Sequence, residues 1–196
     1  MTERIGAIVL AGGRSSRFGR DKLAEPIDGR PLLDRAIAAV QAVASDVVVV
    51  AAPASNPAVP EGVLLARDPV AFEGPLAGLS AGLAELDLVV ERVVVVAGDM
   101  PSLVPAVLMR LLDTIESGPD AAILGHDGEA PPLPMALRRG PAERAVGRLR
   151  GSGERRLRAV AQALDAEVIP ESTWRQDDAT AATLRDIDTP DDLPTA

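Results

Sequence analysis

Short runs of valine, isoleucine, leucine and alanine recur through the first 125 residues, and a glycine, proline or aspartate follows each run within three positions. Such runs are typical of strands that are buried on both faces of a parallel sheet. Segments of helical length lie between most of them, and this alternation predicts a single-domain, Rossmann-like α/β fold with a mostly parallel sheet and helices on both faces. The expected strands are Ile5–Ala11, Val47–Val50, Val63–Ala66, Val93–Ala97 and Ala121–Leu124, and the expected helices are 32–45, 76–86 and Pro105–Ile115.

The pattern loosens after Gly125, where turn residues and arginines become frequent. Strands are expected at Leu133–Leu137 and Glu167–Ile169, with helices at Ala142–Leu149 and Arg155–Leu164 between them, and the tail is expected to be irregular. At 196 residues the chain is long enough for one sizeable core and too short for two ordinary domains. These later elements are therefore expected to add to the same sheet.

Composition excludes several classes of protein. Cysteine is absent, which excludes disulfides, thiolate metal sites and cysteine nucleophiles. The net charge of −9 argues against general binding to nucleic acid or to anionic membranes. No apolar run approaches the roughly 18–20 residues needed to span a bilayer, and the first residues lack the features of a secretion signal. We therefore expect a cytoplasmic protein whose partners include neither nucleic acid nor a membrane.

Positive charge is concentrated in one segment. Between Arg138 and Arg158 there are eight arginines against two glutamates, which gives a local balance of +6 on an otherwise acidic chain. Two interpretations remain open. The segment could form a local anion site, or its arginines could simply be solvated on two helical faces.

A glycine-rich loop follows the first expected strand. The run at 10–22 is LAGGRSSRFGRDK, whose adjacent glycines allow close approach of the backbone, so that its N–H groups can line a concavity for phosphate oxygens. It has neither the Gly-Lys-Ser/Thr of a P-loop nor the G-x-G-x-x-G of a dinucleotide site, which disfavours a dinucleotide-dependent oxidoreductase. Lys22 is the only lysine among 20 lysines and arginines. A compact ammonium on a flexible stem can follow a phosphate into the transition state, which favours a phosphate contact.

Aspartates follow two further expected strands. Asp68 comes after Val63–Ala66, and Asp99 comes after Val93–Ala97. Because ligands of open α/β sheets bind beyond the carboxyl ends of the strands, both carboxylates are expected near the glycine-rich loop. A carboxylate in such a position can hold Mg²⁺. Alternatively, each aspartate only forms the turn that follows its strand.

The glycine-rich loop resembles that of a known family. The run LAGGRSSRFGRDK is similar to L-A-G-G-x-S-x-R-M-G-x-D-K, the signature of the molybdenum cofactor guanylyltransferases, which are MobA-like nucleotidyltransferases. Phe18 stands where methionine is usual. The resemblance implies the nucleotidyltransferase fold, with Mg²⁺ held by Asp99. It implies a nucleotide-binding set of Leu10, Ala11, Gly12, Gly13, Lys22, Asp68 and Asp99, with Lys22, Asp99 and Arg17 as catalytic residues.

Shorter motifs extend the resemblance along the chain. Residues 74–78 (GPLAG) match a family element near the base, whereas the family's asparagine after the second strand has no counterpart before Asn56. Arg138 and Arg139 follow a segment that the family places near its acceptor, although Pro132 stands where glutamine is usual. By resemblance, the two arginines are expected to bind the acceptor phosphate.

The tail at 186–193, DIDTPDDL, resembles the family's N-x-N-T-P-E-D-L, with aspartates in place of both asparagines. Asp186 or Asp188 is expected to reach the metal or the acceptor, with Asp188 as the candidate second metal ligand beside Asp99 and Asp186 as the candidate acceptor contact. Alternatively, the motif only caps a short helix that begins after Thr189.

The resemblance implies transfer of GMP from GTP to Mo-molybdopterin, which gives molybdopterin guanine dinucleotide and pyrophosphate. Residues 1–125 would bind the nucleotide and residues 126–196 the anionic acceptor, with transient contacts to molybdoenzymes or cofactor-insertion proteins. An acceptor phosphate is already ionised at neutral pH, so no general base is needed. The alternatives are a cytidylyltransferase for the same pterin, a transferase for another phosphorylated metabolite, and a non-catalytic nucleotide-binding regulator.

Overall fold

The computed structural model describes residues 4–12, 22–68, 73–116 and 118–193. In this part of the chain, seven strands form one sheet in the order β5-β4-β1-β6-β8-β7-β9, and two short strands form a separate hairpin. The sheet strands are β1 (Arg4–Ala11), β4 (Asp46–Ala51), β5 (Val63–Arg67), β6 (Val90–Ala97), β7 (Ala121–Leu124), β8 (Met135–Arg138) and β9 (Glu167–Ile169). The hairpin is formed by β2 (Pro26–Ile27) and β3 (Arg30–Pro31).

Most neighbouring strands run in the same direction. β1 pairs in parallel with β4 and β6, and β5 continues the parallel sheet beyond β4. β8 runs antiparallel to both β6 and β7, while β9 is parallel to β7. The expected mostly parallel sheet is confirmed. The sheet also continues past residue 125, because β8 and β9 belong to it; different roles for residues 1–125 and 126–196 remain a prediction.

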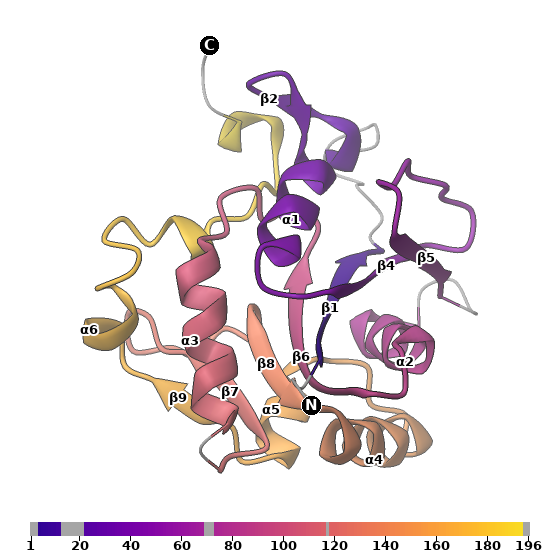
Figure 1. Ribbon diagram of the computed structural model, residues 1–196, viewed down its shortest axis with the longest axis vertical. Coiled ribbons are helices and arrows are strands. Elements are labelled where there is room, and N and C mark those ends of the chain that lie inside the picture. The colour runs from indigo at the N-terminus through magenta and orange to yellow at the C-terminus, as the bar shows by residue number, and fades with distance from the viewer. Residues whose placement is uncertain (1–3, 13–21, 69–72, 117, 194–196) are drawn as a thin grey trace.

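Helices cover both faces of the sheet, as predicted (Figure 1). One face packs against α1 (Leu32–Gln41) and α3 (Pro105–Glu116), and the other against α2 (Pro75–Glu85), α4 (Arg139–Gly151) and α5 (Arg158–Ala163). The remaining helical segments are short: η1 (Lys22–Ala24), α6 (Glu171–Trp174), η2 (Ala182–Leu184) and η3 (Pro190–Asp192). Within the described ranges, none of the helices is both long and apolar enough to cross a bilayer.

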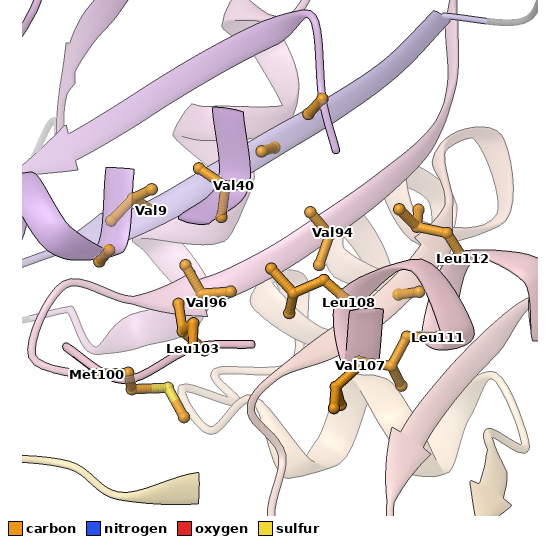
Figure 2. Close-up of a cluster of buried hydrophobic side chains, with 14 of the residues drawn as sticks. Val9, Val40, Val94, Val96, Met100, Leu103, Val107, Leu108, Leu111 and Leu112 are labelled. Atoms are coloured by element: carbon orange, nitrogen blue, oxygen red, sulfur yellow. The ribbon is translucent and has the colours of Figure 1, made fainter. Parts of the chain in front are cut away.

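The central position of β6 explains why its sequence is a continuous run of β-branched residues. Val94 and Val96 pack into the cluster beneath α1 and α3, and Figure 2 shows them beside Leu108 of α3. Val93 and Val95 point to the opposite face and join the cluster beneath α2 and α4. All four valines are fully buried. Since side chains alternate between the faces of a strand, a strand covered on both faces needs an apolar residue at every position.

Two local features differ from the sequence-based expectations. The helix expected at 32–45 ends at Gln41, because the amide of Ser45 donates to the carbonyl of Ile5 in β1 (3.1 Å) and thereby starts β4 beside β1. The β2–β3 hairpin was not expected. Its two-residue turn is Asp28–Gly29, both with positive φ, and Asp-Gly is a typical pair for that turn.

Candidate active site

Three segments that are distant in sequence meet at Lys22. Its Nζ donates a hydrogen bond to Oδ2 of Asp99 at 2.5 Å and to the carbonyl of Ile187 at 3.1 Å. The same Nζ lies 3.4 Å from Oδ1 of Asp188. The only lysine therefore binds both the carboxylate that follows β6 and the C-terminal segment. This places Lys22, Asp99 and Asp188, three of the residues predicted from the sequence, in one cluster.

Main-chain hydrogen bonds fix this cluster at the carboxyl ends of β1 and β6. The amide of Gly98 donates to the carbonyl of Leu10 at 3.0 Å, which holds the end of β6 against the end of β1. The amide of Ile187 donates to the carbonyl of Asp99 at 3.0 Å, which holds the C-terminal segment against the same turn. A Cβ on Gly98 would lie 3.2 Å from Leu33, so a larger residue there would crowd α1.

The cluster is partly shielded from water. The side chain of Lys22 is 14% exposed and that of Asp99 is 19% exposed, whereas Asp188 is 52% exposed. Burial alone would lower the pKa of Lys22, but the hydrogen bond and charge of Asp99, with a smaller contribution from Asp188, raise it above its ordinary value. Lys22 therefore stays protonated and positively charged. Desolvation and the nearby charge of Asp188 raise the pKa of Asp186, because carboxylates of like charge crowd this end of the sheet.

The predicted nucleotide-binding residues line the same edge of the sheet. Leu10 and Ala11 end β1, and the exposed Gly12 follows directly. Asp68 follows β5, and its amide donates to the carbonyl of Ala51 at the end of β4 (3.0 Å). The parallel strands β1, β5 and β6 are therefore each followed by a main-chain segment or a carboxylate that lies beyond the carboxyl ends of the strands. The predicted residues Gly13 and Arg17 lie outside the described residues.

The loop after β4 is tied down by an arginine. Arg67, the last residue of β5, donates to the carbonyl of Ser55 at 2.6 Å and to Oδ1 of Asn56 at 2.7 Å. Asn56 is the first asparagine in the chain, and it lies beyond the position at which the family has one. The amide oxygen of Asn56 therefore already accepts a hydrogen bond from Arg67.

Arg138 does not lie at this site, contrary to expectation. It is the last residue of β8 and pairs with Arg92 near the start of β6, because β8 runs antiparallel to β6. Asp99 follows the other end of β6, seven residues further along, which corresponds to roughly 20 Å of strand. The Nε of Arg138 donates to the main-chain carbonyls of Ile115 and Pro119 at 3.1 and 3.3 Å.

Arg139 lies at the same distant end of the sheet, a position that does not support its predicted contact with the acceptor. It is 8% exposed. Its guanidinium donates to the carbonyls of Leu83 (3.2 Å) and Asp87 (2.5 Å) and pairs with Glu143 at 2.8 Å. These contacts join the start of α4 to the end of α2. Both arginines thus connect structural elements at the opposite end of the sheet from Lys22.

A second charged group lies at the end of β7. His126, Asp127 and Glu171 bring one ligand atom each within 4.8 Å of one another, and the imidazole meets the ring of Trp174 edge-on at 6.0 Å. Glu171 also accepts from the amide of Asp127 (3.1 Å) and pairs with Arg175 (2.9 Å). Arg175 therefore already balances the charge of Glu171.

Sequence reasoning missed two participants in the Lys22 cluster. The first is the carbonyl of Ile187, which accepts from Lys22 and which no side-chain motif can indicate. The second is Asp192, whose carboxylate binds the backbone beside Asp188. The T-P-D-D run does contain the signal for Asp192, because a Thr followed three residues later by an acidic residue is typical of a capping box. The expected cap after Thr189 is present at η3.

Comparisons with known proteins agree with this geometry. Residues 7–168 match the model of the MobA-like NTP transferase domain. A probable molybdenum cofactor guanylyltransferase of Chloroflexus aggregans is 36% identical, over 96% of this chain and 91% of that protein. The crystal structure of molybdopterin-guanine dinucleotide biosynthesis protein A from Archaeoglobus fulgidus superposes with a TM-score of 0.77 at 25% identity, over 96% of this chain and 94% of that chain.

A third protein shares only the fold. Rv0371c of Mycobacterium tuberculosis, solved in complex with manganese, has a TM-score of 0.63 at 18% identity, over 85% of this chain and 88% of that chain. The family match spans most of the sheet and all of the strand ends that meet at Lys22 and Asp68. Together with a relative at 36% identity over nearly the full length, it establishes that the chain belongs to the MobA-like NTP transferase family.

Proposed function

We propose that the protein transfers GMP from GTP to Mo-molybdopterin, which yields molybdopterin guanine dinucleotide and pyrophosphate. Family membership supports nucleotidyl transfer, and the name of the Chloroflexus aggregans relative supports this acceptor and this base. The observation that carries the proposal is the convergence of Lys22, Asp99 and Asp188 beyond the carboxyl ends of β1 and β6. A triphosphate placed over the loop after β1 would meet a cation and two carboxylates there.

The donor set fits a hard divalent cation. Oδ2 of Asp99, Oδ1 of Asp188 and the carbonyl of Ile187 all surround one positive charge, the ammonium of Lys22. Carboxylate and carbonyl oxygens are suitable ligands for Mg²⁺, which is usually held by one or two carboxylates together with phosphate oxygens. Asp99 and Asp188 would hold the ion. When bound, Mg²⁺ neutralises the triphosphate and stabilises charge on the leaving pyrophosphate.

The residues of this chain act mainly by positioning and by neutralising charge. The terminal phosphate of the acceptor attacks the α-phosphorus in line, and pyrophosphate leaves from the opposite side. Lys22 exchanges its carboxylate partners for phosphate oxygens and stabilises the charge that develops on them. The exposed backbone at Gly12 lies where it can approach the phosphates closely. Because the attacking phosphate is already ionised, no residue has to remove a proton.

The phosphate site does not by itself select the nucleotide base. Asp68, at the end of β5, is proposed to contact the nucleotide. The position at which the family has an asparagine is occupied by the alanines that follow Val50, and the nearest asparagine, Asn56, is held by Arg67. A cytidylyltransferase for the same pterin would share every feature of the phosphate site. Turnover with GTP, CTP and ATP, each offered alone, distinguishes the two enzymes.

The test is pyrophosphate release by the purified chain with molybdopterin, Mg²⁺ and GTP. Lys22→Ala and Asp99→Ala are each expected to lower turnover by about 10²-fold or more, the effect of removing a group that stabilises the transition state. His126→Ala serves as the control, because His126 lies in the separate group at the end of β7. Equal turnover in all three variants would contradict the site. A nucleotide-binding regulator would bind GTP normally and release no pyrophosphate. The cytoplasmic location and the contacts with molybdoenzymes or insertion proteins remain predictions.

A further inference from the structure

One carboxylate organises the backbone next to the proposed active site. Oδ2 of Asp192 accepts hydrogen bonds from the amide of Asp188 at 3.0 Å and from the amide of Thr189 at 2.7 Å. The hydroxyl of Thr189 donates to the same oxygen at 2.9 Å. Three donors therefore converge on a single atom. Hydrogen bonds to an ionised acceptor are roughly twice as strong as neutral ones, so this carboxylate can define the conformation of the turn.

The other side of the turn is fixed by Ile187. This side chain is 5% exposed and packs against Ile27 of the hairpin and Leu32 of α1. Its amide donates to the carbonyl of Asp99, and its own carbonyl accepts from Lys22. Figure 1 shows the C-terminal segment, in yellow, beside the β2–β3 hairpin.

The main chain between Ile187 and Thr189 is thus held at both ends. The residue in the middle, Asp188, has its amide bound to Asp192 and its carboxylate 3.4 Å from Lys22. A displacement of this short stretch would move both the Ile187 carbonyl and the Asp188 carboxylate relative to the ammonium. Lys22 has a long, flexible side chain, so its position depends on these partners.

We propose that Asp192 is a positioning residue, which holds the Ile187–Asp188 backbone so that Lys22 and Asp188 face the triphosphate. The proposal rests on the function proposed above. Asp192 need not touch the substrate, because its effect passes through the two neighbours of Lys22. Misplacement of a positioned group by about 1 Å can cost as much as 10²-fold in rate, so a residue of this kind can matter without contacting the reaction.

The adjacent Asp191 provides a matched control. It lies in the same short helix, has the same charge and is exposed. Within the described part of the chain, its carboxylate makes no hydrogen bond comparable to those of Asp192. Asp191→Ala and Asp192→Ala therefore remove the same atoms and the same charge from neighbouring positions, and they differ only in the bonds to the turn.

The first measurement needs no nucleotide. Because Lys22 is the only lysine, incorporation of lysine labelled with ¹³C at Cε gives a single side-chain NMR signal for the full chain. Asp192→Ala is expected to shift that signal and to accelerate hydrogen exchange at the amides of Asp188 and Thr189, whereas Asp191→Ala leaves both unchanged. An unshifted Lys22 signal in a folded Asp192→Ala variant overturns the proposal. If that variant does not fold, Asp192→Ser, whose shorter side chain is not expected to reach the amides of Asp188 and Thr189, is measured by the same criterion.

The second measurement is a double-mutant cycle on GTP affinity in the presence of Mg²⁺. Asp192→Ala is expected to weaken binding by about tenfold in the wild-type background and by only about threefold when Lys22 is already alanine, since part of its effect passes through Lys22 and the rest through Asp188. Equal losses in both backgrounds would mean that Asp192 acts independently of Lys22, which overturns the proposal. A shifted Lys22 signal combined with normal turnover of Lys22→Ala would instead refute the proposed function and leave the positioning intact.

Discussion

The two ends of the sheet each hold a buried or half-buried cation, but the partners of the two cations differ. At the carboxyl end, Lys22 is held mainly by the carboxylates of Asp99 and Asp188, which a metal ion or a phosphate can replace. At the opposite end, Arg139 is held by two main-chain carbonyls and by Glu143. The Leu83 carbonyl belongs to the last turn of α2, where carbonyls have no partner within the helix, whereas the Asp87 carbonyl also accepts from the amide of Val90.

This difference separates a functional cation from a structural one. The guanidinium of Arg139 joins two elements, and its loss would leave the buried Leu83 carbonyl without this partner. An ammonium held between carboxylates can be displaced, because the carboxylates can bind a metal ion instead and the ammonium can then bind a phosphate. The chemistry of the partners therefore distinguishes the two sites better than the residue type.

The largest effect is expected when the lysine is replaced by an arginine. Lys22→Arg should lower turnover by about 10²-fold although the charge is kept, because a planar guanidinium cannot follow the phosphate as a compact ammonium does. Its stability should change little. Steady-state pyrophosphate release and the urea midpoint measure the two quantities. Full activity in Lys22→Arg would mean that only charge is needed at this position.

The converse change, Arg139→Lys, is expected to affect folding and not binding. An ammonium cannot serve the Leu83 carbonyl, the Asp87 carbonyl and Glu143 with the fixed geometry of a guanidinium, so the free energy of unfolding should fall by about 2 kcal/mol. Urea denaturation measures this loss. Arg144→Ala, at an exposed position of the same helix, should stay within about 0.5 kcal/mol of the wild type. A weaker affinity of Arg139→Lys for GTP would break the distinction between the two ends.

The sequence indicated that Lys22 and Asp99 would meet, but it did not indicate the positions of Arg138 and Arg139. Lys22 and Asp99 come after apolar runs that are typical of buried strands, and the ends of parallel strands meet at one edge. Arg138 also adjoins an apolar run. That run does not encode strand direction, and the antiparallel β8 carries its arginines to the wrong end. An apolar run can indicate that a segment is a strand, but the direction of that strand in the sheet depends on the connection that precedes it.

The C-terminal segment shows a second limit of sequence reasoning. The capping turn after Thr189 and a contact of Asp188 with the site were alternatives in the sequence, yet both occur together. The cap is what places Asp188 beside Lys22. Likewise, the end of α1 at Gln41 depends on a hydrogen bond to Ile5, which helix propensity within the segment cannot reveal.

The smallest effects are expected from the half-exposed partner at each end, Asp188 and Glu143, whose side chains are 52% and 46% exposed. Glu143→Gln removes only an exposed helical i,i+4 pair and should cost less than about 0.5 kcal/mol of stability, with no change in GTP affinity. Asp188→Asn keeps an oxygen beside Lys22 but removes a charge, so affinity for Mg²⁺ with GTP should fall by about fivefold at low salt, and by less at high salt. Calorimetric titration at two salt concentrations measures both variants. If Asp188→Asn changes the affinity for Mg²⁺ with GTP no more than Glu143→Gln does at either salt concentration, an exchangeable carboxylate does not distinguish the end of the sheet that holds Lys22.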